Sequence, residues 1–293
     1  MAEPCKLCPR GCAVDREEKT GFCAVPETML IARAAPHYGE EPCISGTRGS
    51  GAVFFCGCNL RCVFCQNHDI SRGGRGKAVS VRELRDIFLR LRDAGVHNIN
   101  LVTPSHYSLK IAEALSGLAL GIPVVWNSSG YESVETLRQL EGLVQVYMPD
   151  LKYADSALAA RYSAAADYPQ RALAAIKEMY RQAGPFRMDG EGILQSGLLI
   201  RHLILPGNAE NTLRCIDMVE DNLPAKKILF SLMSQYTPMP GLEGFPELRR
   251  TITRQEYDRC ASYLDFSDIE FGYFQSPDSA TEEMIPDFDG TGV

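Results

Sequence analysis

Residues 52–65 read Ala52-Val-Phe-Phe-Cys-Gly-Cys-Asn-Leu-Arg-Cys-Val-Phe-Cys65, an apolar run followed at once by three cysteines in the spacing C-x3-C-x2-C. The apolar run predicts a buried strand, so the cysteines lie on the loop that follows it. An iron–sulfur cube normally takes four cysteines, one per iron, and a loop with three leaves one iron open to a ligand from outside the protein. The stretch therefore predicts a cluster with a reaction site, held by Cys58, Cys62 and Cys65.

A structural zinc ion is the alternative for this loop. Zinc needs a fourth protein ligand, and Cys56 could supply it, because residues two apart on a strand point to the same side. The spacing, the preceding strand and the aromatic Phe64 just before the last cysteine together favour the cluster.

Strand-like and helical segments alternate from residue 52 onward, which is typical of βα units and a parallel sheet. Two of the helix starts carry the Ser/Thr-x-x-Glu capping box, Ser80 with Glu83 and Thr253 with Glu256. The predicted strands are residues 52–56, 98–102, 123–126, 144–148, 198–205, 227–232 and 269–274. The predicted helices are residues 81–94, 108–118, 134–140, 170–182, 211–221 and 254–264.

Six or seven such units favour an α/β fold built as an incomplete (β/α)6 barrel of the TIM type over a doubly wound sheet. Residues 51–276 form this predicted barrel. Residues 1–50 show no βα pattern and predict a small Cys-rich, metal-binding cap, and residues 277–293 predict an irregular tail on the surface.

The cysteine loop after the first strand of a partial barrel, with an aromatic before the last cysteine, resembles the radical S-adenosylmethionine (SAM) superfamily. The resemblance implies that Cys58, Cys62 and Cys65 hold a [4Fe-4S] cluster, with Phe64 beside the cofactor. It also implies that SAM binds the open iron through its amino and carboxylate groups. One electron from the cluster then cleaves SAM to methionine and a 5′-deoxyadenosyl radical, which abstracts hydrogen.

Further segments resemble the activating enzymes of glycyl radical enzymes, in the branch similar to pyruvate formate-lyase activating enzyme that carries an N-terminal cysteine group. This resemblance covers essentially the whole chain. It implies a partner glycyl radical enzyme as substrate and a reductant protein of the flavodoxin or ferredoxin type. The matching segments are Cys8-Pro-Arg-Gly-Cys12, 55–67, Asp150-Leu-Lys152, 201–207 and Phe288-Asp-Gly-Thr-Gly-Val293.

Polar residues stand where the predicted strands end, which is where parallel barrels build their sites. Arg201 alternates with apolar residues in a strand, and a buried guanidinium needs an acceptor such as Asp150 or the SAM carboxylate. His106 and Tyr236, near the same end, are candidates for substrate contacts. The residues expected to bind the cofactor are Phe64, Thr103, Ser105, Asn127, Asp150, Lys152 and Arg201.

Two of these positions depart from the family pattern. Thr103-Pro-Ser105 occupies the turn where the family has Gly-Gly-Glu, whose backbone receives the SAM amino group. In the resembling enzymes the Asp-Leu-Lys motif reaches SAM, and its aspartate, here Asp150, helps to bind a monovalent cation. Asn127 stands where those enzymes often carry an acid, so a cation site here has one charge fewer, and an amide oxygen is the weaker ligand.

A second cysteine group, Cys5, Cys8, Cys12 and Cys23, has the spacing C-x2-C-x3-C-x10-C. The segment is too short to build an apolar core of its own, so a bound metal would supply its stability. Four thiolates fit a structural zinc ion or a second [4Fe-4S] cluster, and free thiols are the remaining alternative.

Composition excludes several classes of protein. The 293 residues carry 30 Lys and Arg against 37 Asp and Glu, a net charge of −7, without a long basic tract, so the chain is not expected to bind nucleic acid. The longest apolar run, residues 115–126, is too short to cross a bilayer, and the amino terminus lacks a signal sequence, so we expect a cytoplasmic protein without a membrane partner.

The sequence therefore predicts a radical SAM enzyme of the glycyl radical activase type, which takes hydrogen from a glycine of a partner protein. A radical SAM enzyme acting on a small molecule or a peptide is the first alternative. The second is a non-catalytic metal-binding adaptor in which both cysteine groups are structural, and the three-thiolate loop argues against it.

Overall fold

A computed structural model of the chain describes residues 4–73, 75–276 and 286–293. Its centre is a curved parallel sheet with the strand order β2-β4-β5-β6-β8-β9-β10. These strands confirm the predicted ones, with ends shifted by a few residues. Their bounds are β2 Ser50–Phe55, β4 Ile99–Val102, β5 Val124–Ser128, β6 Val146–Pro149, β8 Leu194–Leu203, β9 Leu229–Met233 and β10 Gly272–Phe274.

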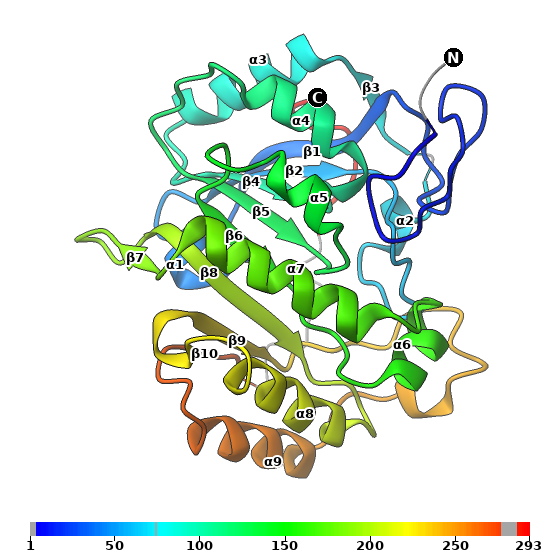
Figure 1. The fold of residues 1–293 in the computed structure, drawn as a ribbon, viewed down its shortest axis with the longest axis vertical. Helices are drawn as coiled ribbons and strands as arrows, with labels where there is room; N and C mark the ends of the chain where they lie inside the picture. The colour runs from blue at the N-terminus through cyan, green and yellow to red at the C-terminus, as the bar shows by residue number, and fades with distance from the viewer. Residues whose placement is uncertain (1–3, 74, 277–285) are drawn as a thin grey trace.

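Helices connect these strands and cover the outer face of the sheet (Figure 1). Both predicted capping boxes are present, at Ser80 before α3 and at Thr253 before α9, so each helix starts where the sequence indicates. The connecting helices are α3 Val81–Asp93, α4 Ser108–Leu115, α5 Val134–Arg138, α6 Ser156–Ser163, α7 Tyr168–Ala183, α8 Ala209–Glu220 and α9 Arg254–Asp265. The sheet and its helices confirm the predicted partial (β/α) barrel.

The amino-terminal region, in which the sequence shows no βα pattern, contains a strand of the sheet. Residues Met29–His37 form β1, which pairs antiparallel with β2 and with β3 (Lys77–Val79) and so extends the sheet. Four of the nine residues in β1 are Ala or Pro, which are uncommon in strands, and this composition hides the alternating burial of the strand.

The carboxyl-terminal residues 286–293 lie along β1. The amide of Ala34 donates to the Thr291 carbonyl at 2.9 Å, and the amide of Gly290 donates to the Ala32 carbonyl at 2.9 Å. Gly292 has a φ of +72°, and a Cβ there would lie 2.0 Å from the Ala34 carbonyl oxygen, so only glycine fits. Residues 277–285 of the predicted tail lie outside the described residues.

A short helix, α1 (Pro42–Ser45), closes the end of the barrel at which the parallel strands begin (Figure 1). Its Cys43 and Ile44 pack against inward-facing side chains of the sheet, among them Val125 and Val146. The Asn98 side chain donates to the Ile44 carbonyl at 2.7 Å. The interior of the barrel is therefore plugged at this end and accessible at the other.

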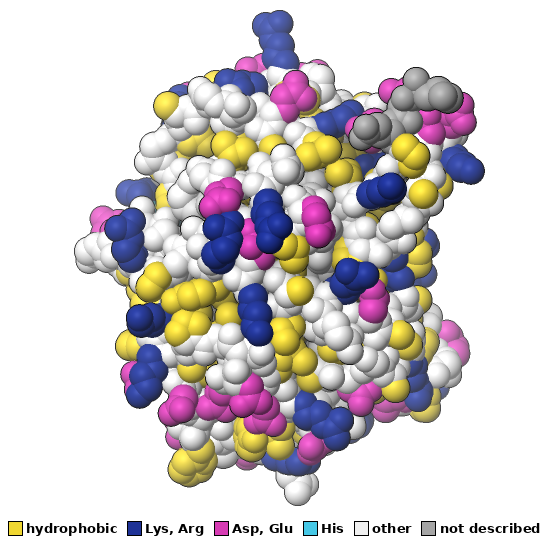
Figure 2. Space-filling model, viewed as in Figure 1, with side chains coloured by type: hydrophobic (Ala, Val, Ile, Leu, Met, Phe, Trp, Pro, Cys, Tyr) yellow, Lys and Arg dark blue, Asp and Glu magenta, His cyan; other side chains and the backbone are white. Residues whose placement is uncertain are grey.

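Basic and acidic side chains are interspersed on the face formed by α7, α8 and α9 (Figure 2). Within residues 4–73, 75–276 and 286–293, no helix is both long and apolar enough to cross a membrane. The remaining short elements are α2 His68–Ser71, the strand β7 Arg187–Met188 paired with β8, and 3-10 turns at 105–107, 225–227 and 246–248.

Candidate active site

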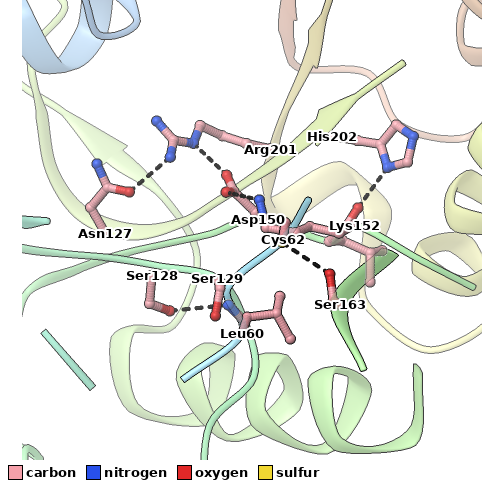
Figure 3. Close-up of polar contacts among 12 residues, drawn as sticks. Leu60, Cys62, Asn127, Ser128, Ser129, Asp150, Lys152, Ser163, Arg201 and His202 are labelled. Carbon is pink, nitrogen blue, oxygen red and sulfur yellow. Dashed lines mark hydrogen bonds and ion pairs between the residues drawn. The ribbon is translucent and has the colours of Figure 1, made fainter. Parts of the chain in front are cut away.

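The cysteine loop follows β2 directly and turns tightly. Arg61 lies in the left-handed region, with a φ of +52°, between Cys58 and Cys62. The amide of Leu60 donates to Cys58 Sγ at 3.3 Å, and the hydroxyl of Ser163 donates to Cys62 Sγ at 3.0 Å (Figure 3). Hydrogen bonds of this kind stabilise a thiolate, the form of cysteine that binds iron. The loop therefore fits a thiolate-bound cluster.

The three thiols are close to one another; Cys58 and Cys62 are buried, and Cys65 is partly buried. Burial, together with the nearby Cys62 and Cys65, raises the pKa of the Cys58 thiol to about 12. A metal must therefore displace their protons. Among the described residues, no three His, Cys, Asp or Glu side chains gather around a point that could hold a single metal ion. In a cube each thiolate would bind an iron of its own.

A network of charged side chains lies inside the barrel beside Cys62 (Figure 3). Arg201 on β8 donates through Nε to Asp150 Oδ1 at 2.9 Å and through Nη2 to Asn127 Oδ1 at 2.8 Å. Lys152 Nζ donates to Asp150 Oδ2 at 2.6 Å. The expected partnership of Arg201 with Asp150 is present, and Asn127 and Lys152 belong to the same network.

These paired charges keep one another ionised. Burial alone would raise the pKa of Asp150, but Arg201 and Lys152 hold that pKa below its usual value. Burial alone would lower the pKa of Lys152, but the Asp150 carboxylate and the nearby Cys62 raise it. Lys152 therefore remains a cation beside the sulfur ligands, where it can offset the negative charge of bound thiolates.

The loop that carries Asp150 and Lys152 is fixed by Tyr168 on α7. The buried Tyr168 hydroxyl accepts from the Lys152 amide at 2.9 Å and lies 2.7 Å from the Asp150 carbonyl oxygen. The amide of Leu151 donates to the Arg201 carbonyl at 2.8 Å, which continues the β6–β8 pairing beyond the end of β6. Both charged side chains are thus held in position by the fold.

A cavity of about 200 Å³ joins the cysteines to this network. Phe64 lines it and is packed edge-on against Tyr153, Tyr162 and Tyr236, so its ring is fixed beside the cysteines. The predicted site residues that line the cavity are Cys58, Cys62, Cys65, Phe64, Thr103, Asn127, Asp150, Lys152 and Arg201.

Of the two residues in the turn after β4 that were predicted to bind the cofactor, one lines the cavity and the other does not. Thr103 lines the cavity with a φ of +58°, a conformation that is unfavourable for a β-branched residue and that explains why the family has glycine in this turn. Ser105 points out of the barrel, and its hydroxyl donates to Glu132 Oε1 at 2.6 Å. The structure therefore does not bring the Ser105 side chain to the cavity.

Sequence reasoning missed one residue of the network, Glu40. Its carboxylate accepts from Arg201 Nη1 at 2.9 Å and from the side chains of Asn100 and Asn127 at 3.0 and 3.1 Å. Glu40 lies two residues before α1, the helix that plugs the barrel, so it enters the barrel from the closed end. The sequence feature that could have pointed to Glu40 as a site residue is the acidic pair Glu40-Glu41, which lies in a segment without a recognised pattern.

Two candidate substrate contacts, His106 and Tyr236, do not line this cavity. His106 is buried outside the barrel, and its Nε2 lies 2.7 Å from the Cys56 carbonyl oxygen. The hydroxyl of Tyr236 donates to the Leu248 carbonyl at 2.6 Å, and this ring is also buried. Each side chain has a hydrogen-bond partner within the fold, His106 through Nε2 and Tyr236 through its hydroxyl.

The second cysteine group lies beside the first. Cys5, Cys8, Cys12 and Cys23 line one small cavity, and the Cys23 carbonyl oxygen lies so close to Gly57 that a Cβ there would be 2.6 Å away. The segment that carries them is placed at the end of the barrel to which the strand arrows point (Figure 1).

Comparison with known sequences agrees with this geometry. Residues 52–189 match the pattern of the Radical SAM superfamily. Over 279 residues the chain is 30% identical to an uncharacterized protein of Methanocaldococcus jannaschii, MJ0674, and the alignment covers 92% of this chain and 76% of that protein.

The fold is similar to solved structures of SuiB from Streptococcus suis and of HydG, a maturase of the [FeFe]-hydrogenase. SuiB bound to S-adenosylmethionine gives a TM-score of 0.53 at 16% identity, over 75% of this chain and 48% of SuiB. SuiB bound to its precursor peptide SuiA gives 0.53 at 17%, over 75% and 46%. HydG gives 0.51 at 13%, over 80% and 53%. The chain thus spans about half the length of these proteins, and the likeness concerns the fold.

A superfamily pattern that runs from β2 to β7, and a 30% identical relative aligned over nearly the whole sequence, lead to one assignment. The chain belongs to the radical SAM superfamily, which implies a [4Fe-4S] cluster and SAM as its cofactors.

Proposed function

We propose that this protein uses radical SAM chemistry to abstract a hydrogen atom from a glycine Cα of a partner protein, as the activating enzymes of glycyl radical enzymes do. The observation that carries the radical chemistry is the cavity that joins the three thiols of the Cys58 loop to the charged network around Asp150. The glycine substrate rests on the sequence segments shared with the activases.

Cys58, Cys62 and Cys65 would hold a [4Fe-4S] cluster, which would pass one electron from an external reductant to SAM for its cleavage to methionine and a 5′-deoxyadenosyl radical. The protein's own residues place the substrate groups. The Lys152 ammonium group is a cation at the cavity wall, suited to the SAM carboxylate. Arg201 has its three nitrogens bonded to Asp150, Glu40 and Asn127, so it positions those side chains and need not bind SAM itself.

The carboxylates that could bind a monovalent cation already have partners in this network. Asp150 already bonds Lys152 and Arg201 through its two oxygens, and Glu40 bonds Arg201 as well. A cation would have to compete with these two bound side chains, so the proposal does not include one.

A peptide substrate is the second candidate. SuiB, whose fold is similar, has been solved with its precursor peptide SuiA. The barrel of this chain is plugged by α1 at one end, so any substrate, whether a peptide or a glycine loop of a folded protein, would approach from the end that carries the cysteines.

The test is anaerobic reconstitution with iron and sulfide, followed by a flavodoxin- or ferredoxin-type reductant and SAM. We expect 5′-deoxyadenosine and methionine to form, and a partner glycyl radical enzyme to acquire the electron paramagnetic resonance (EPR) signal of a glycyl radical. Cys62→Ser should abolish both products, because it removes one cluster ligand, whereas Cys260→Ala, a buried cysteine outside both groups, should retain them.

Different outcomes test the activase role and the cluster assignment separately. SAM cleavage without a glycyl radical on any candidate partner contradicts the activase role and favours another substrate. Unchanged SAM cleavage in Cys62→Ser contradicts the cluster assignment itself.

A further inference from the structure

Two sulfurs of the cysteine loop receive their hydrogen bonds from different parts of the chain. Cys58 Sγ accepts from the amide of Leu60, which belongs to the same loop, at 3.3 Å. Cys62 Sγ accepts from the hydroxyl of Ser163, which lies 101 residues later in the chain, at 3.0 Å (Figure 3). The donor to Cys62 therefore depends on the tertiary fold, and its side chain can be changed without changing the loop.

Ser163 is the last residue of α6, and two sets of contacts hold this end of the helix against the cysteine loop. The amide of Val63 donates to the Tyr162 carbonyl at 2.9 Å. Arg10 joins the same two segments, because its Nε donates to the Asn59 carbonyl and its Nη2 to the Ser163 carbonyl, both at 2.8 Å. The backbone of Ser163 is thus fixed relative to the loop that carries the cysteines.

A second hydroxyl determines the direction of the Ser163 proton. The hydroxyl of the buried Tyr153 lies 2.7 Å from Ser163 Oγ. A thiolate that binds iron has no proton, so the hydrogen bond from Ser163 to Cys62 uses the single proton of the serine hydroxyl. Tyr153 must then donate its own proton to Ser163 Oγ. Both protons point toward the sulfur, and in a buried chain of this kind the first hydrogen bond strengthens the second.

A hydrogen bond to a cysteine sulfur changes the energy of electron transfer at a bound cluster. The reduced cluster has one negative charge more than the oxidised cluster, so a donor at a sulfur stabilises the reduced form more and raises the reduction potential. Water does not replace this donor readily, because Cys62 is 6% exposed and Ser163 is 3% exposed. In such surroundings the electrostatic effect of one donor is larger than in water.

We propose that Ser163 is a positioning residue that acts through Cys62 to raise the reduction potential of the cluster, and that Tyr153 orients its hydroxyl. The inference rests on the proposed function in one respect, the assignment of a [4Fe-4S] cluster to Cys58, Cys62 and Cys65, and it holds for any substrate. A higher potential favours the transfer of one electron from the external reductant to the cluster. It also makes the reduced cluster a weaker donor of that electron to SAM.

Ser163→Ala removes the donor and leaves all three cysteines in place. The potential is measured on anaerobically reconstituted protein by a redox titration that follows the EPR signal altered by SAM, since SAM binds the open iron of this cluster. At a fixed solution potential, the ratio of reduced to oxidised cluster should fall roughly tenfold, which for one electron is a potential lower by about 59 mV. Iron content should equal that of the unmodified protein.

Three further variants separate the hydrogen bond from a general disturbance of the fold. Tyr153→Phe keeps the ring that packs against Phe64 and should lower the potential by less than Ser163→Ala, because Ser163 still donates to Cys62. Ser163→Thr keeps the hydroxyl and should keep the potential close to that of the unmodified protein. Ser156→Ala, at the opposite end of α6, is the matched control and should leave the potential unchanged.

The rate of SAM cleavage provides a second readout. With a reductant whose potential is close to that of the cluster, Ser163→Ala should cleave SAM more slowly, because a smaller fraction of the clusters is reduced. In a single turnover that starts from fully reduced protein, the variant should be at least as fast as the unmodified protein, because its cluster is the stronger electron donor. A misplaced cysteine loop would slow both reactions.

An unchanged or higher potential in Ser163→Ala, or slower SAM cleavage by the fully reduced variant, would refute the inference and leave the proposed function intact. If Ser163→Ala does not fold, the potential of Tyr153→Phe decides in the same way. Unmodified protein that assembles no SAM-responsive cluster would contradict the proposed function, and the inference about Ser163 with it.

Discussion

At the carboxyl ends of the strands, carboxyl groups inside the barrel are paired with cations, whereas a buried carboxyl group on the outer face of the sheet is not. Inside the barrel, the side chains of Asp150 and Glu40 are 16% and 10% exposed and lie beside Lys152 and Arg201, so that two carboxylates meet two cations. On the outer face, Glu132 is 2% exposed, accepts from Ser105 and Trp126, and has a second oxygen without a partner.

The difference shows what a cation does for a buried carboxylate. Burial raises the pKa of Glu132 to about 7, and its hydrogen bonds only partly oppose this shift. Arg201 and Lys152 reverse the same effect at Asp150. The interior keeps permanent charges for a charged cofactor, while the outer face holds an acid that ionises near neutral pH.

Glu132→Gln should have the largest effect on the free energy of unfolding. The folded-state pKa of Glu132 is raised, so its contribution is fully present below its unfolded pKa of 4.5 and is lost as the pH rises through about 7. The variant should therefore be more stable than the unmodified protein at pH 8, by on the order of 3 kcal/mol, and the gain should vanish near pH 4.5. Urea titrations across this range measure it.

Glu135→Gln removes an exposed carboxylate three residues away and should not reproduce this pH dependence. A constant difference between Glu132→Gln and the unmodified protein at every pH would mean that Glu132 does not ionise in this range.

Lys152→Ala tests the interior. Loss of a hydrogen bond between charged groups costs roughly 1.5–3 kcal/mol, so SAM should bind roughly ten- to a hundredfold more weakly. Iron content should be retained, because Lys152 is not a cluster ligand. Calorimetric titration with SAM on reconstituted protein measures the affinity. A large fall in melting temperature with SAM affinity preserved would make Lys152 a structural residue.

Glu40→Gln removes one charge from the interior without changing its shape. Arg201 keeps Asp150 and Asn127, so the expected loss of stability is about 1–2 kcal/mol, together with less than a tenfold loss in SAM affinity. The stability and SAM affinity of Glu40→Gln are compared with those of Glu41→Gln, which changes the adjacent residue. Equal stability of Glu40→Gln and the unmodified protein would show that the Glu40 carboxylate is not needed by Arg201.

Thr103→Gly should have the smallest effect. Glycine adopts the φ of +58° without strain, so about 1 kcal/mol of strain is relieved and partly offset by the greater freedom of the unfolded chain. We expect a change in melting temperature of a few degrees at most, and unchanged SAM cleavage. Thr103→Val, which keeps the branched side chain, should not be stabilising. A marked loss of SAM cleavage in Thr103→Gly would give the threonine side chain itself a function.

The local parts of the fold followed from the sequence. The capping boxes fixed the starts of α3 and α9, the alternation of apolar runs and helices gave the barrel, and strand ends gave Asp150, Lys152 and Arg201. These features depend on neighbouring residues or on the common edge of a parallel sheet, and both can be read from one segment at a time.

The missed parts depend on contacts between distant segments. Glu40 enters the site only because α1 plugs the barrel, and the direction of Ser105 depends on the 3-10 turn at 105–107 and on Glu132. The neighbourhood of the two cysteine groups likewise depends on Arg10 reaching Asn59 and Ser163. No periodicity within one segment encodes such pairings.

The long sequence separation of two contacts sets an order of events during synthesis. Arg201, the partner of Glu40, is synthesised 161 residues after it, and Ser163, the partner of Arg10, is synthesised 153 residues after it. At about 5–20 residues per second, these partners emerge roughly 8–30 s after the amino-terminal segment. During that interval Arg10 has no acceptor at Ser163 and Glu40 has no Arg201, so the amino-terminal segment and the plug are on the ribosome without these contacts to the barrel.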